Sequence, residues 1–95
     1  MAAYVLVDCK VTDPARYDTY KKLAEVAVTR HGGRYLARGG ENVMLEGTRH
    51  PNRVVVLEFP TLERAKAFYD SAEYLAARAA RAGAAEMQIV AVAGV

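Results

Sequence analysis

The chain has 95 residues, 25% of them charged, and a formal net charge of +2. These values predict one folded domain spanning residues 1–95 and argue against a disordered chain. The 13 lysines and arginines are scattered, with no run of three together, so we expect no nucleic-acid partner.

The single cysteine and the N-terminal sequence both bear on where the protein works. Cys9 cannot form an internal disulfide, and neither a metal site nor a cofactor is expected. The first residues, MAAYVLVDCK, lack the basic start and long apolar stretch of a signal peptide. No apolar run approaches the roughly 20 residues needed to cross a bilayer. The sequence therefore predicts a cytoplasmic protein without a membrane partner.

The first third of the chain predicts a strand followed by a helix. Apolar side chains alternate along residues 3–11, which is typical of a strand with one fully apolar face. Asp13 and Pro14 are residues that favour a helix start, and the helical pattern continues to about Arg30. Its buried stripe is expected to contain Tyr17, Tyr20, Leu23 with Ala24, and Ala27.

The middle of the chain predicts strands. Residues 34–38 and 42–46 resemble two short strands joined by a hairpin turn at 39–41, and residues 47–52 resemble a polar loop. The most strand-like segment is 53–59, RVVVLEF. Its odd positions from Val55 onward form one apolar face, and Val54, Val56 and Glu58 form the other.

The last third predicts helix and then strand. Helical spacing begins at Leu62, Ser71 could end that helix and cap a second one, and Gly83 ends the helical sequence. A final strand is expected over residues 87–93. The resulting order of elements predicts an α+β, ferredoxin-like split βαβ fold, an antiparallel sheet with two helices on one face.

The uncovered face of that sheet predicts self-association. It would carry a largely apolar set: Tyr4, Leu6, Asp8, Val54, Val56, Glu58, Val90 and Val92. Such a patch normally marks an interaction surface, and pairing with a second copy would bury it. Asp8, Glu58 and Arg38 would then face the space between two sheets, either as structural ion pairs with nearby arginines or as the lining of a polar pocket.

Three segments resemble a known family. They are YVLVDCKVTDPARYDTY, HGGRYLARGGENVMLEG and RVVVLEFPTLERAKAFYDSAEY. Together they resemble the bacterial domain-of-unknown-function family 1330, in the dimeric α+β barrel superfamily with the antibiotic-biosynthesis monooxygenase-like and EthD-like proteins. The resemblance covers essentially the whole chain. It implies a homodimer with a shared barrel and, in each protomer, a cleft between sheet and helices, but it implies no reaction.

The tyrosines provide the candidate site. With neighbouring polar residues they could line an aromatic cleft, or they could simply fill the core. The candidate cleft residues are Tyr17, Tyr20, Arg38, His50, Glu58, Tyr69 and Tyr74. One hypothesis is a dimer that binds a small apolar or aromatic organic molecule. The alternative is a cofactor-independent enzyme of monooxygenase, isomerase or dehydratase type, which would need a general base in that cleft.

Overall fold

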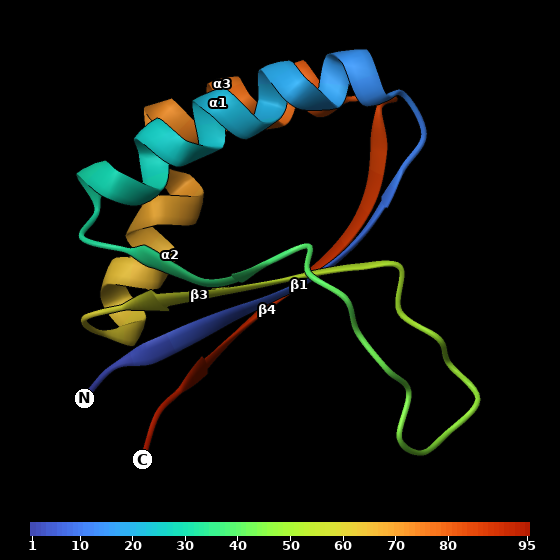
Figure 1. Cartoon of the computed structure of the whole chain (residues 1–95). Coiled ribbons are helices and arrows are strands. Elements are labelled where there is room, and N and C mark those ends of the chain that lie inside the picture. The colour runs from blue at the N-terminus through green and yellow to red at the C-terminus, as the bar shows by residue number, and fades with distance from the viewer.

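A computed structural model describes residues 1–95 and shows one four-stranded antiparallel sheet with three helices above it (Figure 1). The sheet order is β2-β3-β1-β4. In chain order the elements are β1 (Ala3–Val11), α1 (Pro14–Arg30), β2 (Arg34–Arg38), β3 (Arg53–Phe59), α2 (Leu62–Asp70), α3 (Ala72–Arg81) and β4 (Ala85–Ala93). The predicted α+β, ferredoxin-like arrangement is confirmed. No helix has the length and apolar character that crossing a membrane requires.

Side-chain caps set where the helices begin. The Asp13 carboxylate accepts the backbone N–H of Arg16 at 3.3 Å, and Pro14 occupies the first helical turn. The predicted break at Ser71 is confirmed, because its hydroxyl accepts the backbone N–H of Tyr74 at 3.1 Å and begins α3. These polar side chains satisfy N–H groups that have no partner inside the helix. The second predicted helix is therefore two helices, α2 and α3.

The prediction of a strand over residues 42–46 is wrong. Those residues belong to an irregular segment. A long connection joins β2 to β3, and there is no tight hairpin between them. A strand is stabilised by hydrogen bonds to a neighbouring strand, and residues 42–46 have no such neighbour. We call residues 40–52 the arm. In Figure 1 the arm projects from the sheet on the side away from the helices.

A bulge in β2 decides which way its side chains point. Arg34 and Tyr35 pair with Glu58 and Leu57, and the register then shifts by one residue at Leu36. A bulge places two residues opposite one, so simple alternation fails beyond it. As a result Arg38 pairs with Val55, whose side chain lies on the helix-covered face. The prediction that Arg38 faces the uncovered side is wrong for this reason.

The two faces of the sheet differ in burial. Facing the helices is a core cluster that includes Val5, Val7, Leu57 and Phe59. Within α1 the structure buries Ala24 but leaves Leu23 36% exposed, so Leu23 is not part of the buried stripe as predicted. The residues expected on the uncovered face pair side by side there, and none of them is buried.

Candidate functional site

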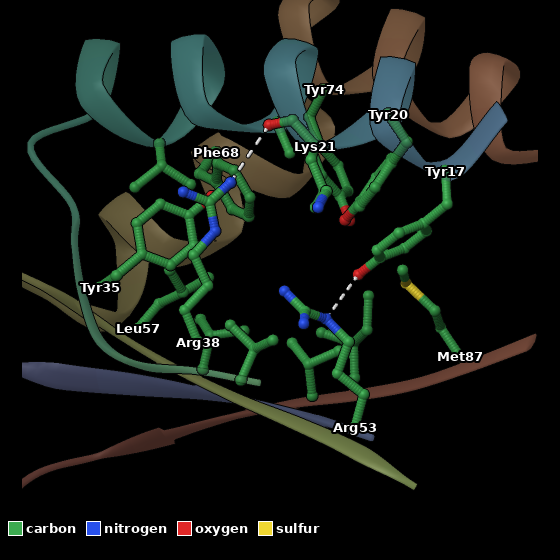
Figure 2. A pocket seen from close by; sticks show the side chains of 16 residues that line it. Tyr17, Tyr20, Lys21, Tyr35, Arg38, Arg53, Leu57, Phe68, Tyr74 and Met87 are labelled. Carbon is green, nitrogen blue, oxygen red and sulfur yellow. Dashed lines mark hydrogen bonds between the residues drawn. The ribbon is translucent and has the colours of Figure 1, made fainter. Parts of the chain in front are cut away.

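A cleft between α1 and the sheet brings four of the predicted residues together. Tyr17 and Tyr20 come from α1, Tyr74 from α3, and Arg38 from the end of β2 (Figure 2). Helical spacing places the α1 tyrosines one turn apart on the face that packs against the sheet, and their rings lie 5.3 Å apart between centroids. Thirteen of the sixteen residues that line this cleft are hydrophobic. We call it the inner cleft.

Three cations complete the inner cleft: Lys21, Arg38 and Arg53. The Arg38 guanidinium stacks 4.2 Å from the Tyr35 ring centroid and donates to the Glu25 carboxylate at 3.3 Å. Figure 2 shows Arg38 and Arg53 extending from the sheet toward the α1 side chains. The inner cleft therefore combines aromatic rings with cationic side chains.

Arg53 differs from the other two cations because it has no carboxylate partner. Lys21 pairs with Asp18 and Arg38 with Glu25, whereas no salt bridge involves Arg53. Its Nε donates to the Tyr17 hydroxyl at 3.2 Å, and its guanidinium carbon lies 5.6 Å from the centroid of that ring. The remaining N–H groups of this guanidinium are therefore available to an acceptor.

The space inside the inner cleft is small. Its cavity volume is about 30 Å³, which is enough for roughly one or two water molecules. A second cavity of about 340 Å³, the outer cleft, opens between α2 and β4. Both clefts share four lining residues, Val5, Phe68, Met87 and Ile89, which separate them. Met87, one of the four, is an unbranched and adaptable side chain.

Burial raises the pKa values of several groups in this region. Desolvation is the largest cause for Tyr17, Tyr20 and Tyr35, whose hydroxyl pKa values are all raised above 10.0. The pKa of the buried Cys9 thiol is also raised, again mainly by desolvation. These groups keep their protons at neutral pH, so none of them is activated as a base or nucleophile there.

The other predicted cleft residues lie elsewhere. Tyr69 lines the outer cleft. Glu58 lies on the uncovered face of the sheet and pairs with Arg34 at 2.6 Å between Oε1 and Nε. His50 lies on the arm, beside a polar depression that Asp8 also lines, and Asp8 accepts the backbone N–H of Asn52 at 3.1 Å. The expectation that Glu58 and His50 share the aromatic cleft is wrong, because the sheet separates them from it.

Arg53 and Tyr35 are cleft residues that the sequence analysis did not select. Arg53 shares odd numbering with Val55 and Leu57 along one strand. That alternation places it on the covered face. Tyr35 also lies on the covered face, because it pairs with Leu57. That pairing depends on the register between β2 and β3. No cluster of three or more metal-ligating side chains occurs in the structure.

A protein-family model matches nearly the whole chain. The family model described as "Domain of unknown function (DUF1330)" matches residues 2–95. The chain belongs to this family. A search of curated proteins found no match to the sequence. The DUF1330 assignment agrees with the resemblance seen in the sequence.

Solved structures share the fold at low sequence identity. A protein of unknown function from Rhodopseudomonas palustris is 18% identical, with a TM-score of 0.78, over 99% of this chain and 82% of its own. A dimeric ferredoxin-like protein from Thermobifida fusca is 18% identical, with a TM-score of 0.68, over 99% and 92%. SnoaB, a cofactor-independent oxygenase from Streptomyces nogalater, is 10% identical, with a TM-score of 0.67, over 99% and 93%. These likenesses establish the fold.

A hydroxyl pair at the top of the inner cleft gives a first prediction. The Tyr20 and Tyr74 hydroxyls lie 2.8 Å apart, and both side chains are buried. Changing either tyrosine to Phe leaves one buried hydroxyl without a partner, at a cost of about 1–3 kcal/mol in the free energy of unfolding. Changing both removes the unpaired group, so the double variant should cost less than the sum of the two single variants. Urea unfolding of all four proteins measures this, and additive effects would contradict the pairing.

Proposed function

We propose that residues 1–95 form one domain of a homodimeric α+β barrel whose inner cleft binds a small aromatic organic anion. Two observations support the dimer. Leu6, Val90 and Val92 are 41%, 57% and 48% exposed on the uncovered face, such patches normally mark interfaces, and the Thermobifida fusca neighbour is described as dimeric. The lone, buried Cys9 suits a reducing compartment, and we assign the dimer to the cytoplasm.

The ligand class rests on one observation, the unpaired guanidinium of Arg53 inside an aromatic cleft. A cation without a carboxylate partner in a mostly apolar space gains most from a ligand that brings its own negative charge. The rings of Tyr17, Tyr20 and Tyr35 provide flat apolar surface beside it. An aromatic carboxylate or sulfonate has both parts, a planar body and a terminal anion.

The small volume of the inner cleft requires side chains to move before such a ligand enters. The hydrogen bonds of the two arginines are long: 3.3 Å and 3.4 Å for Arg38 and 3.2 Å for Arg53. These lengths are at or beyond the upper end of the usual range, and arginine side chains have many rotamers. We therefore infer that Arg38 and Arg53 act as a flexible gate that first covers the cleft and then contacts the ligand's anionic group.

The enzyme alternative has less support from the same cleft. No carboxylate or histidine lines the inner cleft, and the tyrosines with raised pKa values hold their protons at neutral pH. Proton abstraction from a substrate needs a positioned group that is unprotonated at the working pH. Ligand binding requires only the aromatic surface and the cations, and both are present.

The ligand class is tested by comparing benzoate with benzamide, which have nearly the same shape and differ in charge. We expect benzoate to bind and benzamide to bind at least about tenfold more weakly, because only benzoate pairs with Arg53. In Arg53→Gln the affinity for benzoate should fall by about tenfold or more. Isothermal titration calorimetry measures each affinity.

Arg81→Gln is the matched control for this experiment. Arg81 lines the outer cleft and also lies near Tyr20, with 5.6 Å between its guanidinium carbon and the ring centroid. Its loss should change benzoate affinity by less than about twofold, since it does not line the inner cleft. If neither compound binds, or if Arg53→Gln and Arg81→Gln weaken benzoate equally, the proposed ligand site is wrong.

A further inference from the structure

The arm has few ties to its own protomer. Asn52, its last residue, donates its backbone N–H to Asp8, and no other residue of the arm hydrogen-bonds outside it. Val43 is 76% exposed and Leu45 is 89% exposed. Two apolar side chains at the tip of a weakly held segment gain stability only when another surface covers them.

The position of the arm indicates which surface would cover Val43 and Leu45. The arm hangs on the side of the sheet away from the helices (Figure 1), and its base contacts Asp8, which belongs to the uncovered face. It therefore borders the apolar face that we propose pairs with a second copy. An arm on this side would lie next to a second copy that covers this face.

The two ends of the arm are joined to the inner cleft. Arg38 precedes Gly39 at one end and Arg53 follows Asn52 at the other, and both arginines line the cleft. Gly39 has a φ of +72°, and a Cβ placed there would collide with Nη1 of Arg53. The Arg53 side chain thus crosses directly over the start of the arm. The Arg53 side chain and the residues at the start of the arm therefore lie against each other.

We propose that the arm is a clasp that packs Val43 and Leu45 against the second copy of the chain and, by doing so, positions Arg53 in the inner cleft. This inference rests on the proposed pairing of the sheets and does not depend on the identity of the ligand. It makes the dimer a condition for a well-ordered cleft. A monomer would have the same residues with the arm free and Arg53 less fixed.

The first test removes the clasp and keeps the sheet. Arg38 pairs with Val55 and the Gly39 N–H donates to the Val54 carbonyl oxygen, so continuing this register places Gly40 opposite Arg53. Replacing residues 41–52 with Asn-Gly would then close a two-residue hairpin, for which Asn-Gly is favoured. We expect the dimer dissociation constant, measured by sedimentation equilibrium, to rise by about tenfold or more.

The second test keeps the arm and changes only its tip. The double variant Val43→Asp/Leu45→Asp should raise the dissociation constant similarly, because it places charge in an apolar contact. Leu75→Asp is the control, since Leu75 is 52% exposed on α3, among the helices. In the tip variant the NMR signal of the Arg53 Nε–H should also move toward that of the diluted, monomeric wild type, although both substitutions lie at least eight residues from Arg53.

The outcomes separate this inference from the proposed dimer. A dimer whose dissociation constant is unchanged in both arm variants would overturn the clasp and leave the sheet pairing intact. A raised dissociation constant with an unchanged NMR signal of the Arg53 Nε–H would overturn the proposal that the arm positions Arg53 in the inner cleft. A wild-type chain that stays monomeric at every concentration would overturn both the dimer and the clasp. Weaker dimers together with a shifted Arg53 signal would support the whole inference.

Discussion

Replacing Val90 with Asp is expected to convert the dimer into monomers. Val90 is 57% exposed on the uncovered face and pairs with Leu6 in the neighbouring strand. Two-fold pairing of this face would bury one new carboxylate from each copy without a cationic partner, which costs several kcal/mol. We expect the dissociation constant to rise by about 100-fold or more, as measured by sedimentation equilibrium.

Val26→Asp provides the control for this prediction. Val26 is 49% exposed on α1, on the helix-covered side of the sheet, and receives the same substitution at similar exposure. The dimer should keep its dissociation constant in this variant. Because both positions are exposed in the protomer, each substitution should change the free energy of unfolding by only about 1 kcal/mol or less. A Val90→Asp protein that dimerises like wild type would show that the pairing uses another surface.

Raising the pH above about 9 is expected to destabilise the folded protein progressively. The pKa of Cys9 is raised above 9.0 and those of Tyr17, Tyr20 and Tyr35 above 10.0, mainly because burial disfavours the charged forms. The unfolded chain therefore releases these protons at lower pH than the folded chain does. The stability they contribute is complete below their unfolded pKa values and is lost as the pH rises toward the folded ones.

Tyr20 should dominate this alkaline loss. It is 8% exposed, its hydroxyl contacts that of Tyr74, and its pKa is the most strongly raised of the four. One such group lowers the free energy of unfolding by up to about 1.4 kcal/mol for each pH unit above 10. Urea unfolding between pH 8 and about 11.5 should show a shallower decline in Tyr20→Phe than in wild type. Parallel declines in the two proteins would contradict this assignment.

Part of the candidate site could be predicted from the sequence, and the missing part has a specific physical cause. Tyr17, Tyr20 and Tyr74 follow from helical periodicity, because three- and four-residue spacing determines which side of a helix faces the sheet. Arg53 could have been placed by strand alternation, whereas Arg38 could not. Its direction depends on a bulge at Leu36 that appears only when β2 is paired with β3. The position of His50 could not be predicted, because a loop has no periodicity from which to infer a face.

The sequence by itself determined the elements that carry their own local signals. The alternation of β1, the Asp13 cap of α1, the Ser71 break and the glycine that ends the last helix each act within a few residues of the chain. Interactions over such short distances are encoded by neighbouring residues, so they can be inferred without knowing the fold. These signals also suffice for the order of elements and hence for the fold class.

Only the tertiary structure decided what depends on distant partners. The segment 42–46 has strand-like composition but no neighbouring strand, so it belongs to the arm. Glu58 pairs with Arg34 across two strands, and the guanidinium of Arg53 is left without a carboxylate because none of the surrounding elements brings one near. Pairing, register and the relative positions of charges arise between residues far apart in the chain, where local preferences carry no information.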